Sequence, residues 1–205
     1  EFNVSRALGG GSRFLPNIAA EPVTVAGVGL RDQFSLGVDP LGWRLFGDVR
    51  AEGGWIAAHG TGLARREGRG YGRLAGDATL SRGFGEQVAA ALTVGGGVSD
   101  NAPVQRAFFL GGAQTVRGQL LGTAAGEAYW LGRAELGRAT GVVRPVLFGD
   151  LGWAGARADW RTPGRPISGA GIGASVFDGL VRLDLSRGIY PRQKMRLDLY
   201  VEGRF

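Results

Sequence analysis

The amino-acid sequence predicts an all-β fold, an antiparallel transmembrane β-barrel of about ten strands. Apolar and polar residues alternate with a period of two along most of the chain, as in strands with two different faces. Short turns and long loops alternate between these segments, which is typical of barrels that cross outer membranes. No stretch approaches the roughly 18 consecutive apolar residues of a membrane-spanning helix.

The alternation is clearest at the C-terminus, where apolar and polar side chains take turns from Met195 to Phe205. Residues 181–186 repeat it, with Val and Leu at odd positions and Arg, Asp and Ser at even positions. Three further segments place Trp and Leu on one face and charged residues on the other: 43–55, 129–138 and 146–154. Weaker alternation marks the remaining expected strands: 1–8, 28–38, 73–84, 86–98 and 167–177.

The connections fall into two classes by length. The short ones contain residues 39–42, 83–86, 140–145 and 177–179, and the long ones contain residues 59–70, 99–126 and 157–166. In outer-membrane barrels the short turns face the periplasm and the long loops face the exterior. Trp and Tyr residues near several strand ends fit a girdle at the membrane interface.

A soluble β-sandwich is the alternative fold, because its strands also alternate between a core face and a charged face in water. Two features favour the barrel. Arg, Asp and Glu crowd the polar side of single strands, as in a lumen where charges pair between neighbouring strands. The apolar face persists on strand after strand, which suits contact with lipid.

Composition excludes several kinds of site. The 205 residues include 39 Gly, one His and no Cys, so a disulfide framework and a thiolate metal site are excluded and a His-based metal cluster is not expected. The formal net charge is +6, but the arginines are scattered singly and Lys194 is the only lysine. Such a spread suits membrane headgroups or a polar lumen better than nucleic acid.

Catalytic motifs are also missing from the sequence. It contains no G-x-S-x-G elbow, no phosphate-binding P-loop and no HExxH zinc motif. His59 lies in a glycine-rich connection, where a solvated histidine is the ordinary interpretation. We therefore expect neither an enzyme nor a bound cofactor or metal.

One loop stands out within this pattern. Residues 108–122 read FFLGGAQTVRGQLLG, and Arg117 is the one charged residue between Ala107 and Gly126. A lone arginine in a water-filled space gains little from distant charges. Arg117 is therefore either bound to a specific acidic partner or an exposed loop arginine without a partner.

Three motifs together resemble the BamA/TamA superfamily of outer-membrane insertases and translocases, also called the bacterial surface antigen family, to which the two-partner secretion transporters belong. They are FFLGGAQTVRG (108–118), GRAELGR (132–138) and FGDLG (148–152). Five expected strands follow the loop, as in that family, and the chain ends on Phe205, which matches the usual terminal aromatic signal of outer-membrane barrels.

The resemblance implies a lock between the loop and the barrel wall. In the family the loop folds into the barrel, and its arginine reaches acidic residues, here Arg117 with Glu135 and Asp150. A guanidinium can bridge two carboxylates in a way that lysine cannot. The matching loop and strand motif positions are Gly111, Gly112, Val116 and Gly118, and Phe148 and Gly152. The family usually has an aromatic residue after the RG pair, where this chain has Gln119.

The implied function is insertion of outer-membrane proteins, or translocation of proteins, at the outer membrane of a Gram-negative bacterium. The implied partners are outer-membrane lipids, unfolded outer-membrane or secreted proteins, and possible periplasmic domains or accessory proteins; no nucleic acid is expected. Family barrels have sixteen strands preceded by periplasmic domains. The expected ten strands therefore represent the C-terminal part of such a barrel or a reduced barrel, and the second case favours a passive channel or structural barrel.

Overall fold

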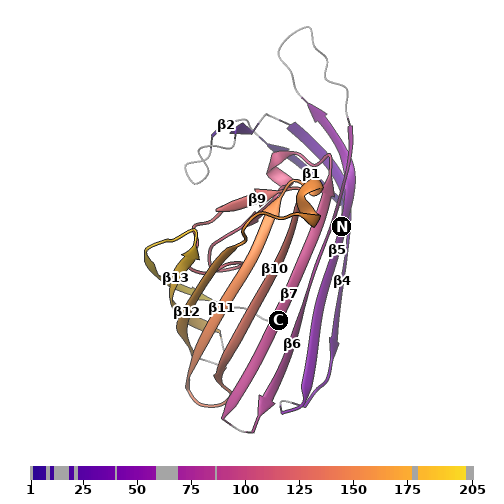
Figure 1. Cartoon of the computed structure of the whole chain (residues 1–205). Coiled ribbons are helices and arrows are strands. Elements are labelled where there is room, and N and C mark those ends of the chain that lie inside the picture. Colours follow the sequence, from indigo (N-terminus) through magenta and orange to yellow (C-terminus); the bar gives the residue numbers. More distant parts are fainter. Residues whose placement is uncertain are drawn as a thin grey trace.

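The computed structural model describes residues 2–7, 10–11, 19–20, 23–39, 41–58, 69–85, 87–176 and 180–201 (Figure 1). A ten-stranded sheet dominates it, in the order β1-β4-β5-β6-β7-β10-β11-β12-β13-β14. These strands are β1 Phe2–Ala7, β4 Val23–Leu36, β5 Trp43–Ala58, β6 Arg69–Phe84, β7 Val88–Asp100, β10 Ala128–Arg138, β11 Val143–Gly155, β12 Ile167–Val176, β13 Val181–Tyr190 and β14 Met195–Val201.

The remaining elements are short. β2 (Gly10–Gly11) pairs with β3 (Ala19–Ala20), and β8 (Phe108–Leu110) pairs with β9 (Ala124–Gly126). Two 3-10 helices, η1 (Val104–Arg106) and η2 (Arg157–Arg161), lie within the connections. Within the described ranges, no helix has the length and apolar character needed to cross a membrane.

Every neighbouring pair in the large sheet is antiparallel, so the predicted all-β antiparallel fold is confirmed. The predicted closure into a barrel is not seen in this structure. A closed barrel needs its two outermost strands to pair with each other. In the described part of the chain, β1 pairs with β4 and β14 pairs with β13, which leaves a curved open sheet (Figure 1).

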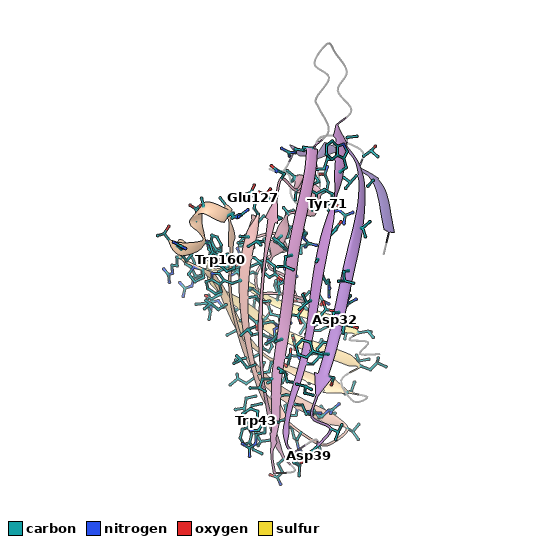
Figure 2. The ribbon with its side chains drawn as sticks, turned by 90° about the vertical axis from the view of Figure 1, so that its right-hand side faces the viewer. Asp32, Asp39, Trp43, Tyr71, Glu127 and Trp160 are labelled. Carbon is teal, nitrogen blue, oxygen red and sulfur yellow. The ribbon has the colours of Figure 1, made fainter. Side chains whose placement is uncertain are left out.

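The pairing register explains how alternation becomes two faces. In β5, Asp48 pairs with Asp77 of β6, and both lie on the concave face, whereas Val49 pairs with Gly76 on the convex face. The convex face exposes large apolar side chains on strand after strand: Val28 62%, Val49 44%, Leu92 50%, Leu147 58%, Leu183 42% and Leu199 71%. Asp32 breaks this pattern, because its register with Val49 puts it on the convex face, in the second half of β4 (Figure 2).

The connections divide between the two ends of the sheet. The β4–β5, β6–β7 and β10–β11 turns at one end are short, and the long connection between β7 and β10 lies at the other end. The predicted connection at 177–179 and residues 59–68 of the one predicted at 59–70 lie outside the described residues, and residues 69–70 already belong to β6. Figure 2 places Trp43 at the end with the short turns and Trp160 near the end with the long connections.

The core lies between the sheet and the long connection. Leu110 and Val116 of that connection form a buried cluster with Ile167 at the start of β12. Partly buried side chains of β10 and β11 pack around this cluster: Tyr129, Leu131 and Ala154. The connection predicted at 99–126 therefore folds onto the concave face, and it brings Arg117 with it.

Candidate functional site

The loop between β8 and β9 reaches the sheet because its own turns are internally bonded. The amide of Gly111 donates to Thr115 Oγ1 at 2.8 Å, and this hydroxyl donates back to the carbonyl of Gly111 at 2.9 Å. The amide of Gly112 donates to the carbonyl of Gln119 at 2.9 Å. These bonds fold residues 111–119 into a compact tip, which presents Val116 and Arg117 to the sheet.

Gly118 lets the tip make its closest approach. Its φ of +81° is a backbone conformation that residues with a side chain rarely adopt. A Cβ atom there would also lie 2.6 Å from the amide nitrogen of Gly188 in β13. The predicted motif glycines Gly111 and Gly112 also have positive φ, at +114° and +85°.

Arg117 binds Asp150 of β11 through three donors. Its Nε lies 2.6 Å from Asp150 Oδ2, its Nη2 lies 2.6 Å from Oδ1, and its backbone amide lies 2.9 Å from Oδ2. The guanidinium thus meets the carboxylate in a bidentate fork, the strongest geometry for this pair. The side chain of Arg117 is 1% exposed and that of Asp150 is 0% exposed, so water competes little for these bonds.

The remaining guanidinium nitrogen of Arg117 serves a second strand. Nη1 donates to Glu135 Oε1 of β10 and lies 3.7 Å from Asp184 Oδ2 of β13. The guanidinium carbon also sits 3.7 Å from the centre of the Phe148 ring. Burial lowers the pKa of Arg117, but the hydrogen bonds and charges of Asp150 and Glu135 outweigh it and hold this pKa above its ordinary value. We call Arg117, Glu135 and Asp150 the loop lock.

Three residues that the sequence did not single out extend this lock. Arg182 of β13 lies 2.9 Å from both Glu135 Oε1 and Asp184 Oδ1. The hydroxyl of Tyr200 in β14 donates to Asp184 Oδ2 at 2.6 Å. Alternation already placed all three on the polar face of their strands, but their convergence on Arg117 and Glu135, directly or through Asp184, depends on how strongly the sheet curves. We call the six residues together the lock network.

Glycines of β12 make room for the lock network. A Cβ atom at Gly169 would collide with the carbonyl oxygen of Arg117, and one at Gly171 would lie 2.7 Å from the Phe148 ring. A Cβ atom at Gly173 would collide with the Asp184 carboxylate. The alternate glycines of ISGAGIGASV were a readable signal, because they leave one face of the strand without side chains. The motif residue Gly152 does the same in β11, where a Cβ atom would lie 2.9 Å from Leu110 Cδ1.

Gln119 anchors the tip by hydrogen bonds in the place of an aromatic ring. Its Nε2 donates to three backbone carbonyls: Ser168 at 2.7 Å, Tyr190 at 3.0 Å and Pro191 at 3.0 Å. The side chain is 0% exposed. The departure from the resembling motif therefore leaves the tip bound both at the start of β12 and at the β13–β14 turn.

The last described strand is tied to the loop as well. Arg196 of β14 donates through Nη1 to the carbonyl of Gln119 at 3.3 Å, and its Nη2 lies 3.0 Å from Asp198 Oδ1. Together with the bond from Tyr200 to Asp184, this gives β14 two side-chain links to the loop and the lock network. Its backbone pairing to β13 runs from Val181↔Val201 to Arg187↔Met195.

A separate group of contacts holds the beginning of the long connection. Arg106 of η1 lies 2.8 Å from Glu52 Oε1 of β5, and the hydroxyl of Tyr71 in β6 donates to the same oxygen at 2.7 Å. Phe108 then packs between Arg73, at 4.3 Å from its ring, and Tyr129, with ring centres 4.6 Å apart. The connection is therefore fastened to β5 and β6 at its start and to β10–β14 at its tip.

The structure thus brings Arg117, Asp150 and Phe148 into one buried group with the partly buried Glu135. Of the loop motif residues, Val116 and Gly118 flank Arg117 directly, and Gly111 and Gly112 shape the turn of the tip. Two residues that drew notice in the sequence, His59 and Phe205, lie outside the described residues. No group of three or more His, Asp or Glu side chains in the described ranges could hold a metal ion. This arrangement can fix a long loop inside a curved sheet.

No protein-family model and no curated protein matches this sequence.

Proposed function

We propose that this chain forms an outer-membrane β-barrel wall of the insertase/translocase superfamily, with the edge of β14 as one side of a seam that pairs with substrate strands. The observation that carries the proposal is the loop tip buried on the concave face by Arg117, Asp150 and Glu135. This is the arrangement implied by the resemblance of the three motifs, and it involves residues from all three.

The convex face supports location in a bilayer. Large apolar side chains are exposed across the sheet from β4 to β14, and a continuous apolar outer band is what lipid requires. Aromatic side chains lie toward both ends of this band, with Trp43 57% exposed at one end and Trp160 39% exposed at the other (Figure 2). Arg82 stacks on Trp43 at 5.1 Å and on Phe84 at 5.3 Å, a mixed cationic and aromatic group suited to an interface.

The edge of β14 supports the seam. Within the described residues one side of β14 pairs with β13 and the other side pairs with no strand. An unpaired edge offers a row of backbone donors and acceptors to an incoming strand. The outward residues of β14 are apolar and highly exposed, with Leu197 at 66% and Leu199 at 71%. A substrate strand with the same alternation would continue both faces of the sheet.

The test is insertion of an unfolded eight-stranded outer-membrane protein into liposomes that contain the full chain. Folding of the substrate is followed by its shift on unheated gels, and the rate is compared with empty liposomes. A proline scan over residues 195–201 gives the matched controls, because successive backbone N–H groups of a strand point alternately to its two sides.

We expect prolines at one alternate set of positions to abolish the acceleration of substrate folding, while the variant chain itself still folds. The other set should instead disrupt pairing with β13. Equal rates with and without the chain would contradict the proposal. A steady ion conductance in planar bilayers together with that result would favour the passive channel.

A further inference from the structure

We propose that the ends of β12–β14 that lie next to the β13–β14 turn form a binding site for the phosphate groups of an anionic lipid, centred on Arg187. This inference rests on the proposed location in a membrane and adds a lipid partner beside the seam strand. The site combines the outward arginine of β13 with the cations of the β13–β14 turn, Arg192 and Lys194, all of which are exposed. We call these three residues the cationic rim.

Arg187 lies on the convex face, where its neighbours carry no charge. It pairs with Ala170 of β12 on one side and with Met195 of β14 on the other. The nearest outward positions along its own strand are Leu185 and Ile189. No acid among the described residues forms an ion pair with it, so this guanidinium has no counter-charge within the described part of the chain and can accept an external anion.

The position of Arg187 fits the headgroup level of a bilayer. It pairs with the first residue of β14 and stands three residues before the end of β13. A cation on the lipid-facing side is costly at the bilayer centre but nearly free near the interface. The long side chain can extend toward the headgroups while its stem stays among apolar neighbours. Below it, Leu183 and Leu197 continue the exposed apolar band.

The surrounding sequence strengthens the positive charge. Residues 185–197 contain Arg187, Arg192, Lys194 and Arg196 and no acid, and residues 160–176 contain two arginines and no acid. Of these two, Arg165 stacks over the Tyr190 ring at 3.9 Å, at the end of β13. Trp160 is nearby in sequence, in η2, and stays partly exposed after packing edge-on to Trp153.

This distribution selects a phosphate-bearing headgroup. Guanidinium groups bind phosphate oxygens through paired donors in a fixed fork, and a lysine adds a mobile point charge. By contrast, Arg157 at the other side of η2 already has an acid within reach, with its Nη1 3.3 Å from Asp100 Oδ1. A second strand-end cation, Arg138 of β10, is also exposed but lies at the opposite end of the sheet. It therefore serves as the matched control.

The experiment measures binding of diphosphorylated lipid A and of its dephosphorylated form to the full chain in neutral detergent, by native mass spectrometry. We expect phosphate-dependent binding that weakens roughly fivefold in Arg187→Gln and roughly a hundredfold when Arg192→Gln and Lys194→Gln are added. Arg187→Lys should recover part of the loss, and Arg138→Gln should leave binding unchanged. The gel shift between heated and unheated samples verifies that each variant is folded.

Equal binding of the two lipid forms, or equal losses in Arg138→Gln and Arg187→Gln, would overturn the inference. Complete competition by millimolar inorganic phosphate would also overturn it, since the site would then recognise the free anion rather than a lipid. The assay needs no substrate protein. Lipid binding without accelerated insertion would therefore refute the proposed function alone, and accelerated insertion without phosphate-dependent binding would refute this inference alone.

Discussion

Both walls of the curved sheet hold a buried aspartate on the concave face, yet their arginine partners differ. In the β10–β14 wall, Asp150 is 0% exposed and its partner Arg117 is 1% exposed. In the β4–β6 wall, the side chain of Asp48 is 3% exposed, but its partners Arg31 and Arg50 are 50% and 54% exposed. The same aspartate–arginine pairing is thus enclosed under the loop tip in one wall, whereas in the other wall its arginines are open to solvent.

The difference shows what the loop adds. An arginine that is half exposed can turn to water when its partner is lost, so its ion pair contributes little to stability. An arginine enclosed with its carboxylates has no such alternative, and removal of one partner leaves a charge buried. The loop tip therefore makes the stability contributions of the lock network residues depend on one another. Charged residues that only line the concave face, with one side in water, lack this dependence.

The largest contrast is expected from matched aspartate substitutions. Asp150→Ala should lower the free energy of unfolding by about 3–5 kcal/mol, because Arg117 loses its bidentate partner inside the protein. Asp48→Ala should cost about 1 kcal/mol or less, since Arg31 and Arg50 can be hydrated. Urea titrations in the same detergent measure both values. Similar losses for the two variants would abolish the distinction between the walls.

Reversal of the charges sharpens this result. Arg117→Glu alone should destabilise the protein at least as much as Asp150→Ala, because it places a fourth acid beside Glu135, Asp150 and Asp184. Addition of Asp150→Arg should restore part of that loss. If the double variant is no more stable than Arg117→Glu, direct pairing between positions 117 and 150 does not account for the stability.

A smaller effect is expected at the glycine that follows the lock arginine. Gly118→Ala should cost about 1–3 kcal/mol and increase cleavage of the loop by protease, because φ is positive and the β13 backbone is in the way. The matched control is Gly85→Ala in the β6–β7 turn, where φ is also positive but a Cβ would meet no atom within 4 Å. Equal protease sensitivity in the two variants would show that close approach at Gly118 is unimportant.

Gln119 should show a loss of similar or slightly smaller size. Gln119→Leu keeps the approximate volume but leaves three carbonyls at the ends of β12 and β13 without this donor, and it should cost about 1–3 kcal/mol. Gln114→Leu, at an exposed position of the same tip, should change stability by about 0.5 kcal/mol or less. Thermal unfolding of the two variants side by side gives the comparison.

The smallest expected effect concerns two tyrosines in equivalent roles. Tyr200→Phe removes the donor to Asp184, and Tyr71→Phe removes the donor to Glu52. Each should cost about 1–2 kcal/mol, since the acceptor is charged. Hydrogen exchange should separate them, with faster exchange of amides 195–201 in Tyr200→Phe and little change there in Tyr71→Phe. The same pattern in both variants would mean that Tyr200 does not tie β14 to the lock network.

Sequence reasoning reached the strands and the centre of the site because both depend on local regularities. Period-two alternation assigns each residue to a face, so Asp150 and Glu135 could be placed on the same side of neighbouring strands. The motif resemblance then suggested Arg117 as their partner. The open edges of the sheet were not predictable in this way, because closure depends on pairing between distant strands.

The rest of the lock network also lay beyond the sequence. Arg182 reaches Glu135, and Asp184 approaches Arg117, across β12 because that strand carries glycines and the sheet curves. The three carbonyls bound by Gln119 lie at the start of β12, at the end of β13 and in the β13–β14 turn, and their relative positions follow from the whole register. The glycines at 169, 171 and 173 could have been read as space for a buried loop, since they remove side chains from one face of a single strand.

Labelling of a single cysteine tests the central claim most directly, because the natural chain has no cysteine. Val116 is 0% exposed beside the lock, and Leu120 at the base of the same tip is 55% exposed. In the otherwise native chain, Val116→Cys should resist a water-soluble maleimide while Leu120→Cys reacts rapidly. Adding Arg117→Ala should make Val116→Cys reactive and leave Leu120→Cys unchanged. Rapid labelling of Val116→Cys with Arg117 intact would contradict a loop held inside the sheet by its arginine.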